Sequence, residues 1–373
     1  MKKAWQKGLV TLSVLALAAC GNSQAPTAST TESSTAITSQ DSSVTIASET
    51  NTEQTSLVIS TFGLSQEEVE KTVMDPFELA EKATITLEVG TGSERLTKLK
   101  SNPNAGIDVI ELSQTNAGDA AAQGLFETLT EEQIPNIANL SDGAKQVFQQ
   151  GDGVPYAVNS IGIVYDPETL GRDIKSWEDL WSEDLAGKIA IPDISTTFGP
   201  AILYLASEYK GVDIETDKGQ AAFEALKELA PNVVKTYAKS SDLANMFQAG
   251  EIEVAIVADF AYGIVVGALP NATYVVPESG TIANYNTINV PKTAANKELA
   301  YKYINYRISA ELAKQTATAF NEGPVNKEVE LTAEEAGNKT YGEIASKAKT
   351  MNTKLINENM SNWLNEWNEI LNQ

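Results

Sequence analysis

From Leu57 onward, short apolar runs with a strand pattern alternate along the chain with segments of helical periodicity. The β-branched run 57–62 ends at Gly63 and predicts a first strand, and a possible capping box opening at Ser65 then precedes apolar residues at helical spacing up to Phe77. Strand patterns return at 83–89 and 107–112, followed by helical segments that begin at Ser93 and at Ala117. This order predicts an α/β unit with a mainly parallel sheet.

A second series of the same kind follows Pro155-Tyr156. Strand patterns lie at 161–165, 188–192 and 253–258, and helical patterns between them begin near Ser176, Pro200, Asp217 and Ser240. The pattern predicts a second α/β lobe. Near the carboxyl terminus, Trp363 and Trp367 lie one helical turn apart, and we expect them to pack on a lobe rather than to contact a ligand.

The first 20 residues have the pattern of an export signal. Three lysines at positions 2, 3 and 7 precede an apolar core at 8–19, which is too short to span a bilayer and suits a signal peptide. Small residues lead into Cys20, as in bacterial lipoprotein signals, so we expect Cys20 to be lipidated and to become the mature amino terminus. The alternative is an ordinary secretory signal with an incidental cysteine.

The segment after the cysteine favours the lipoprotein. Residues 21–56 are about half Ser and Thr and contain no Lys, Arg or aromatic residue. Such a segment cannot bury enough apolar surface to offset the cost of ordering, which predicts a disordered tether with a mean reach of roughly 30 Å. We therefore expect an exported protein anchored by its lipid to the outer face of the cell membrane, or to the periplasmic membrane face.

Composition excludes several classes of function. The 373 residues carry 27 Lys and Arg against 50 Asp and Glu, a net charge of −23, which disfavours nucleic-acid binding. Histidine is absent, which excludes Ser-His-Asp catalysis and imidazole metal sites. The single cysteine excludes an intrachain disulfide.

Short motifs spread over the folded part resemble those of the extracellular solute-binding proteins of ABC importers. The branch that they resemble most contains the spermidine/putrescine-binding proteins. The motifs are 94–96, 108–110, 153–156, 177–181, 187–189, 191–193, 250–251, 276–280, 288–292 and 296–298. The resemblance extends from Leu57 to about Val325, and it depends on the order and spacing of the motifs rather than on any one of them.

The resemblance implies a two-lobed, type II periplasmic-binding fold with a ligand cleft between mainly parallel α/β lobes. Chain crossings are expected near 157–159, 282–284 and 323–324. They divide the chain into a signal peptide (1–19), a lipidated tether (20–56), an amino-terminal lobe (57–157 and 285–323) and a carboxyl-terminal lobe (158–284 and 324–373). The implied partners are a small solute, an ABC permease with its ATPase, and the membrane through the lipid. No cofactor, metal or nucleic acid is implied, and we expect a monomer.

Candidate binding residues come from the predicted strand ends, helix starts and crossings, because ligands in such sheets bind outside the carboxyl ends of the strands. They are Thr61, Phe62, Ser113, Gln114, Asn159, Ser160, Thr196, Thr197, Ser240, Ser241, Asp259, Tyr262, Asn284, Tyr285 and Asn286.

Two classes of solute stay open, and the resemblance favours a polyamine-type amine. Polyamine binders of the family use aromatic rings and carboxylates, and Asp259, Phe62, Tyr262 and Tyr285 could serve here, whereas the family's tryptophan and aspartate fall on Asn284 and Asn286. The alternative is a phosphonate, amino-acid-like or thiamine-like solute held at the helix starts near Thr197 and Ser241. Asp259 could also merely cap local backbone.

Other functions carry less support from the sequence. No pair of carboxylates has the spacing of a glycosidase site, and the possible Ser-x-x-Lys at Ser346 lies in a polar segment, so we expect no enzyme. A role as a ligand sensor or adhesin uses the same fold and stays open.

Overall fold

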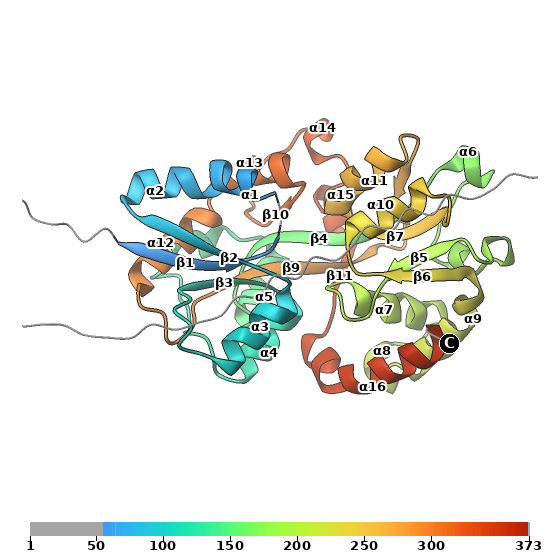
Figure 1. The fold of residues 1–373 in the computed structure, drawn as a ribbon, viewed down its shortest axis with the longest axis horizontal. Helices are drawn as coiled ribbons and strands as arrows, with labels where there is room; N and C mark the ends of the chain where they lie inside the picture. Colours follow the sequence, from blue (N-terminus) through green and yellow to red (C-terminus); the bar gives the residue numbers. More distant parts are fainter. Residues whose placement is uncertain (1–54, 64, 372–373) are drawn as a thin grey trace, which may run out of the picture. The chain divides into compact units, whose positions relative to one another are not determined.

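Two strands cross the middle of the folded part and connect its two halves (Figure 1). The computed structural model describes residues 55–63 and 65–371, so the predicted signal, Cys20 and nearly all of the tether lie outside the described residues. The strand Val154–Tyr165 (β4) is buried at every position, and its first half pairs antiparallel with Thr281–Asn289 (β9). Its second half, Ile161–Tyr165, pairs with a different strand in the other half of the molecule. The main sheet order is β2-β1-β3-β9-β4-β7-β5-β6.

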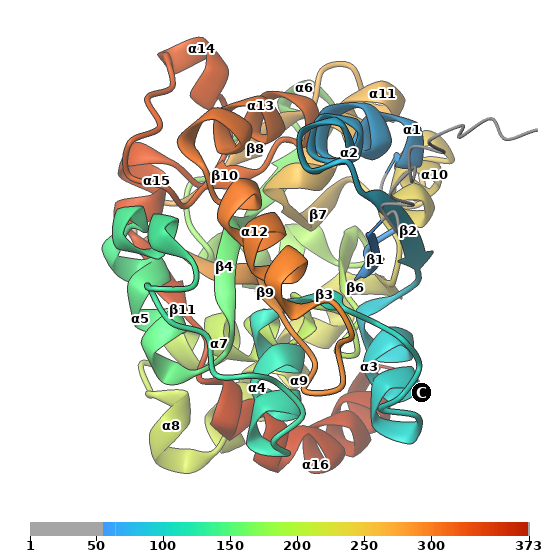
Figure 2. The ribbon, with the colours of Figure 1, turned by 90° about the vertical axis from the view of Figure 1, so that its left-hand side faces the viewer.

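The half that contains the amino-terminal strands is called the first lobe. Its parallel strands β1, β2 and β3 are those that the hydrophobic pattern predicts, within two residues at each end. Helices cover both faces of this sheet, with α2 and α13 on one side and α3 and α4 on the other (Figures 1 and 2). The elements are β1 Ser56–Thr61, α1 Gln66–Val69, α2 Asp75–Glu81, β2 Thr84–Val89, α3 Gly92–Ser101, β3 Val109–Ser113, α4 Gln114–Ala122, α5 Asp142–Gln150, α12 Lys297–Arg307 and α13 Ala310–Phe320.

The second lobe contains the parallel strands β5, β6 and β7. Its core joins these strands to α7, α9 and the carboxyl-terminal helix α16, in which Trp363 and Trp367 are both buried. The predicted packing of the two tryptophans on a lobe is therefore confirmed. The elements are α6 Pro167–Leu170, β5 Ile189–Pro192, α7 Gly199–Tyr209, α8 Ile214–Asp217, α9 Gln220–Leu229, β6 Val233–Tyr237, α10 Ser240–Gln248, β7 Val254–Ala258, α11 Tyr262–Ala268, β8 Thr273–Val275 and α16 Thr353–Leu371.

A third connection between the lobes follows α13. Gly323–Pro324 (β10) pairs with β4, and Ala348–Thr350 (β11) pairs parallel with the start of β9. Between them lie the short helices α14 (Ala333–Ala336) and α15 (Gly342–Ser346). The segment then enters α16, so the chain ends on the second lobe.

Helix starts differ from the sequence expectation at two places. Ser65 makes no side-chain cap on α1, so the predicted capping box is wrong, and the helix continues through a π-helical turn at Glu70–Met74. Thr91 rather than Ser93 caps α3, in a reciprocal pair of bonds with Glu94. The start of α10 at Ser240 agrees with the prediction, and Lys239 occupies its cap position.

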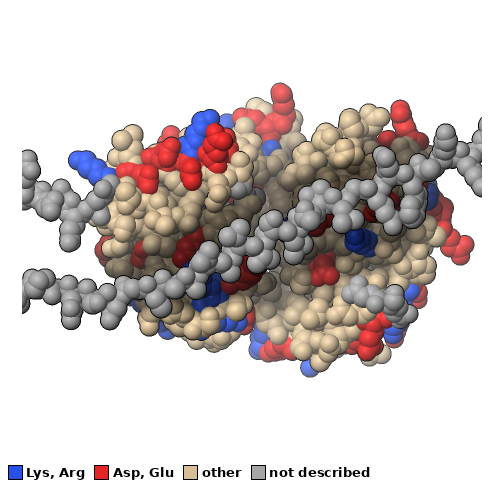
Figure 3. All heavy atoms as spheres, in the orientation of Figure 1, with Lys and Arg blue, Asp and Glu red and all other residues tan. Residues whose placement is uncertain are grey.

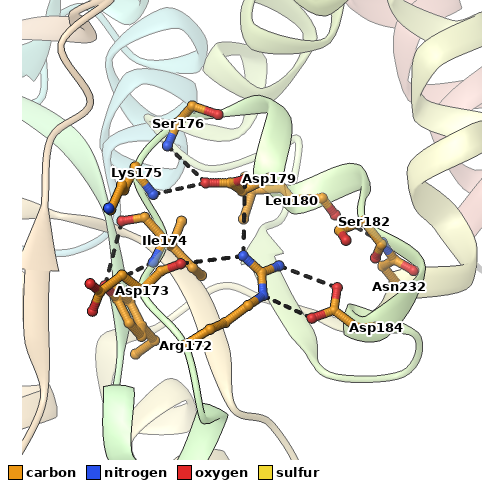
Figure 4. Close-up of polar contacts among 11 residues, drawn as sticks. Arg172, Asp173, Ile174, Lys175, Ser176, Asp179, Leu180, Ser182, Asp184 and Asn232 are labelled. Atoms are coloured by element: carbon orange, nitrogen blue, oxygen red, sulfur yellow. Dashed lines mark hydrogen bonds and ion pairs between the residues drawn. The ribbon is translucent and has the colours of Figure 1, made fainter.

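The tryptophan-containing motif 177–181 is structural. Its residues form a short 3₁₀ helix, Glu178–Trp181, rather than the predicted α-helix. The Asp179 carboxylate accepts the backbone N–H groups of Lys175 and Ser176, while Arg172 forms a forked ion pair with Asp184 (Figure 4). Figure 4 shows these residues gathered on one loop, whose side chains bind each other.

Among the described residues, no helix combines the length and apolarity needed to cross a bilayer.

Candidate functional site

Three asparagines lie together where β4 and β9 cross between the lobes. Asn159 and Asn284 are paired across the two strands, and Asn286 follows two residues later on the same face of β9. Asn284 donates an amide N–H to Asn286 at 3.1 Å, and Asn286 donates to Asn159 at 3.5 Å. These residues are named the asparagine chain.

The asparagine chain ends on a buried carboxylate. Asn159 Nδ2 donates to Asp259 Oδ1 at 2.8 Å, and Asp259 is fully buried in the turn after β7. Burial raises the pKa of Asp259 to about 6, although hydrogen bonds from Thr340 and Asn159 act in the opposite direction. The carboxylate is therefore largely ionised at neutral pH.

The carboxylate sets the direction of the whole chain. An ionised carboxylate only accepts hydrogen bonds, so Asn159 must point its NH₂ group at Asp259 and its oxygen at Asn286. The same reasoning then orients Asn286 and Asn284 in turn. The chain leaves Asn284 Oδ1 at its far end, buried and with no hydrogen-bond partner in the structure.

The remaining bonds of Asp259 tie the third connection to the crossing. Its carboxylate also accepts the backbone N–H of Phe260 at 2.8 Å and both the N–H and the hydroxyl of Thr340, at 3.0 and 2.6 Å. Its carbonyl oxygen accepts the side chains of Asn321 and Asn338. Asp259 is thus surrounded by protein donors, as expected if it caps backbone N–H groups rather than contacting a ligand directly. Ser160 lies beside it and bonds to the Thr340 hydroxyl at 2.8 Å.

The candidates of the first lobe lie at the carboxyl ends of β1 and β3. Thr61 donates to the buried Glu111 at 2.6 Å, and the ring of the half-buried Phe62 lies 4.6 Å from the Arg95 guanidinium carbon. Ser113 and Gln114 are buried at the start of α4, where Gln114 donates to Asp152 at 3.1 Å.

The candidates of the second lobe lie at helix starts and at the lobe surface. Thr196 binds the Asp193 carbonyl oxygen at 2.7 Å, and Thr197 is half-buried. Ser240 and Ser241 begin α10 and form no cap bond. The helices α4, α7 and α10 all begin without a side-chain cap, in contrast to α3.

Two predicted aromatic residues point elsewhere. The hydroxyl group of Tyr262 donates to the Ala272 carbonyl at 2.7 Å, within the second lobe. Tyr285 alternates with its asparagine neighbours and lies on the opposite face of β9, with its hydroxyl directly against Gly143 of α5. The structure therefore does not bring these two rings to the asparagine chain.

Sequence reasoning missed three residues around the cleft. Phe260 follows Asp259 and is 38% exposed, which is unusual for so large an apolar side chain. Glu94 and Lys239 interact electrostatically although they belong to different lobes: hydrogen bonds from Thr91 lower the pKa of Glu94, and the charge of Lys239 lowers it further. The starts of α3 and α10 therefore face each other across the gap between the lobes. The signal that could have identified Phe260 in the sequence is its position directly after Asp259, an expected binding residue.

The space-filling view shows a furrow between the two lobes, with acidic side chains spread over this face of both (Figure 3). Within residues 55–63 and 65–371, no group of three or more Cys, Asp or Glu side chains is placed to hold a metal ion. The site offers a ligand amide and hydroxyl groups, the rings of Phe62 and Phe260, and the starts of helices.

Comparison with known proteins identifies a family. Residues 72–346 match the model of bacterial extracellular solute-binding proteins. A curated relative, spermidine/putrescine-binding periplasmic protein 1 of Haemophilus influenzae, is 28% identical over 228 residues, which cover 60% of this chain and 62% of that protein. The chain thus spans somewhat less than two thirds of the length of this relative.

Solved structures agree with the family match. An ABC transporter protein from Clostridium perfringens is 50% identical, with a TM-score of 0.77 over 84% of this chain and 99% of that one. A spermidine/putrescine ABC transporter substrate-binding protein from Streptococcus pneumoniae is 19% identical, with a TM-score of 0.69 over 84% and 99% of the two chains. The second likeness concerns the fold alone. The expected two-lobed fold is confirmed, and these relatives are transport proteins rather than enzymes.

Proposed function

Because the chain belongs to the bacterial extracellular solute-binding proteins, we propose that it captures a small amine-bearing solute of the polyamine type and delivers it to an ABC permease. In this proposal the solute binds between the lobes, at the asparagine chain, without a cofactor. Residues 57–157 with 285–323, and 158–284 with 324–373, act as the two bodies that close over it.

The observation that carries the amine assignment is the unpartnered Asn284 Oδ1. A buried acceptor without a donor costs free energy, and a ligand N–H would satisfy it. Each amide of the chain donates toward the negative charge of Asp259, and hydrogen bonds in series polarise one another. The charge of Asp259 is thereby relayed to Asn284 Oδ1, which favours a donor that carries positive charge. Asp259 would act through the chain rather than by direct contact.

Groups from both lobes are available to a bound amine. Phe62 of the first lobe and Phe260 of the second expose ring surface near the strand ends, and an alkylammonium group is attracted to such faces. Closure would bring the lobes together over the ligand, as a shift from an open to a closed population. Polyamine-binding relatives support the same ligand class.

A thermal-shift screen tests the ligand class. The probes are putrescine, spermidine, γ-aminobutyrate, glutamine, an aminoalkylphosphonate and thiamine, because a ligand that binds only the folded state raises its Tm. We expect putrescine or spermidine to raise the Tm. If none of the amines raises the Tm, the amine assignment is wrong.

Two variants test the asparagine chain itself. Asn284→Leu keeps the approximate size but removes the acceptor, and we expect affinity for the amine to fall about 10-fold or more. Asn338→Ala is the matched control, since Asn338 binds the Asp259 carbonyl at 3.0 Å but is not part of the chain. Equal losses in both variants would mean that the asparagine chain does not recognise the ligand.

A second candidate is a solute with an anionic head group. The uncapped starts of α4, α7 and α10 leave backbone N–H groups available at strand ends in both lobes, and such groups favour carboxylates or phosphonates. For this class Thr197→Ala and Ser241→Ala should weaken binding, and Asn284→Leu should not.

We also propose that lipidated Cys20 anchors the protein to the membrane. The Cys20→Ala variant should then lose its lipid and appear in the medium or periplasm, as measured by detergent partitioning of fractionated cells. Unchanged partitioning would refute the anchor without affecting the ligand proposal.

A further inference from the structure

The carboxyl-terminal helix α16 belongs to the second lobe but reaches the first. Its later residues Trp363 and Trp367 are buried in the core of the second lobe. Its first turns lie against α4, whose residues belong to the first lobe. The helix is therefore rigidly held at one end and contacts the opposite lobe at the other.

Polar contacts join the two lobes at this place. Asn357 of α16 donates to the carbonyl oxygen of Thr115 at 3.2 Å. Thr353, the first residue of α16, bonds to the buried Asp152, and Asp152 also accepts the amide of Gln114. We call these contacts of α16 with α4 and Asp152 the strut.

The strut is also closely packed. A Cβ atom on Gly118 of α4 would lie 2.8 Å from Asp152 Oδ1 and 3.2 Å from Thr353 Oγ1. Both distances are shorter than ordinary contacts. An added Cβ therefore has to displace the Asp152 carboxylate of the same lobe and the Thr353 hydroxyl of the other lobe.

The strut and the asparagine chain lie on opposite sides of the crossing strands. Asn284 and Asn286 point to one face of β9, while Tyr285 points to the other, against α5. A groove of about 790 Å³ beside the strut is lined by α4, α5, β11 and the start of α16. Figure 2 shows α4 and α16 below β9, with α13 on the other side of it.

We propose that the strut holds the lobes open and must be released when the cleft closes. A rotation about the crossing strands that brings the starts of α3 and α10 together moves α4 away from α16 on the opposite side. Strut contacts are then present in the open state and lost in the closed one. This inference rests on the proposed capture of a solute between the lobes.

The consequence is that weakening the strut tightens binding, although neither Asn357 nor Thr353 belongs to the candidate site. The apparent dissociation constant equals the intrinsic one divided by the closed fraction, so a larger closed fraction lowers it. Loss of the Asn357 and Thr353 bonds should raise the closed fraction about 3-fold to 10-fold.

The experiment measures closure directly, without a ligand. The chain with Cys20→Ala has no thiol, so Ser93→Cys on α3 and Asp242→Cys on α10 introduce one reactive pair across the mouth of the cleft. Their rate of linkage by a short bis-thiol reagent follows the closed population. The double variant Asn357→Ala with Thr353→Val should be linked about 3-fold to 10-fold faster than the parent, and Gly118→Ala should act in the same direction.

Asn359→Ala is the matched control, because the Asn359 side chain donates to the Leu355 carbonyl within α16 itself. Putrescine affinity, measured by calorimetry, should rise by the same factor as the linkage rate. A linkage rate equal to that of Asn359→Ala in both strut variants would overturn the proposal. If putrescine fails to bind the parent protein, the amine assignment fails, while the linkage rates still decide the strut.

Discussion

Protonation of Asp259 should make the folded protein more stable in mild acid than a variant that cannot titrate at this position. The carboxylate is fully buried, and burial raises its pKa to about 6 despite its hydrogen bonds. An ordinary aspartate in the unfolded chain has a pKa of 3.8. The difference of about 2 units corresponds to about 3 kcal/mol, since each unit is worth about 1.4 kcal/mol.

The sign follows from proton binding. Between pH 4 and 6 the folded protein binds this proton and the unfolded chain does not, so the free energy of unfolding falls as the pH rises. The contribution is fully present below about pH 4 and is lost as the pH passes through about 6. The hydroxyl groups permit the change, because Thr340 can donate to ionised Asp259 or accept from its protonated form while it bonds with Ser160.

The assay compares urea unfolding of the wild type and Asp259→Asn from pH 4 to 7.5. Other carboxylates titrate in both proteins, so the difference between the two curves isolates Asp259. We expect the wild type to lose about 3 kcal/mol relative to the variant across this range. The exposed Asp242→Asn serves as the control, and its curve should parallel the wild type. If the free energy of unfolding of Asp259→Asn changes with pH in the same way as that of the wild type, the raised pKa of Asp259 is refuted.

Two further predictions concern the cores of the lobes. Arg307 is buried, and one of its guanidinium nitrogens donates to both carboxylate oxygens of Glu322, at 2.9 and 3.0 Å. Arg307→Ala leaves that carboxylate buried without its partner, so it should lower the free energy of unfolding in urea by about 3–5 kcal/mol. A loss below about 1 kcal/mol would contradict this. Trp363 donates its ring N–H to the Lys218 carbonyl at 2.9 Å, whereas the buried Trp367 N–H has no partner, so Trp363→Phe should be about 1 kcal/mol more costly than Trp367→Phe. Equal costs for the two tryptophan variants would show that the hydrogen bond adds nothing.

Much of the fold follows from local pattern. The β-branched runs that became β1, β3, β5 and β7 are short, apolar and bounded by polar or glycine residues, and buried parallel strands need such runs. Pro200 and Gly211 bracket α7 as expected, because proline suits the first helical turn and glycine the left-handed end. The order of the family motifs then indicated two lobes. One of them, 177–181, has a structural role in the second lobe, where Trp177 donates to the Gly280 carbonyl and Trp181 to the Ala225 carbonyl.

The local sequence pattern did not predict features that depend on contacts between distant segments. The strand predicted at 161–165 is the second half of one continuous strand, Val154–Tyr165. The strand β6, with a partly exposed pattern, gave no clear signal. Thr91 and Ser93 are both suitable caps for α3, and the structure places Thr91 at the cap, in a capping box with Glu94.

The same limit applies to the site. The position of Asp259 just after a predicted strand identified it as a candidate. Asn159 came from an expected chain crossing, and Asn284 and Asn286 came from the resemblance to the family. Whether Asp259 meets a ligand or the protein depends on Thr340, which is 81 residues away along the chain and reaches it only through the third connection between the lobes. In the sequence, an aspartate that binds a ligand looks the same as one that accepts hydrogen bonds from the protein. The tertiary structure decides its role, because it determines which donors surround the carboxylate and leaves Asn284, three amides away, with the one unpartnered acceptor in the asparagine chain.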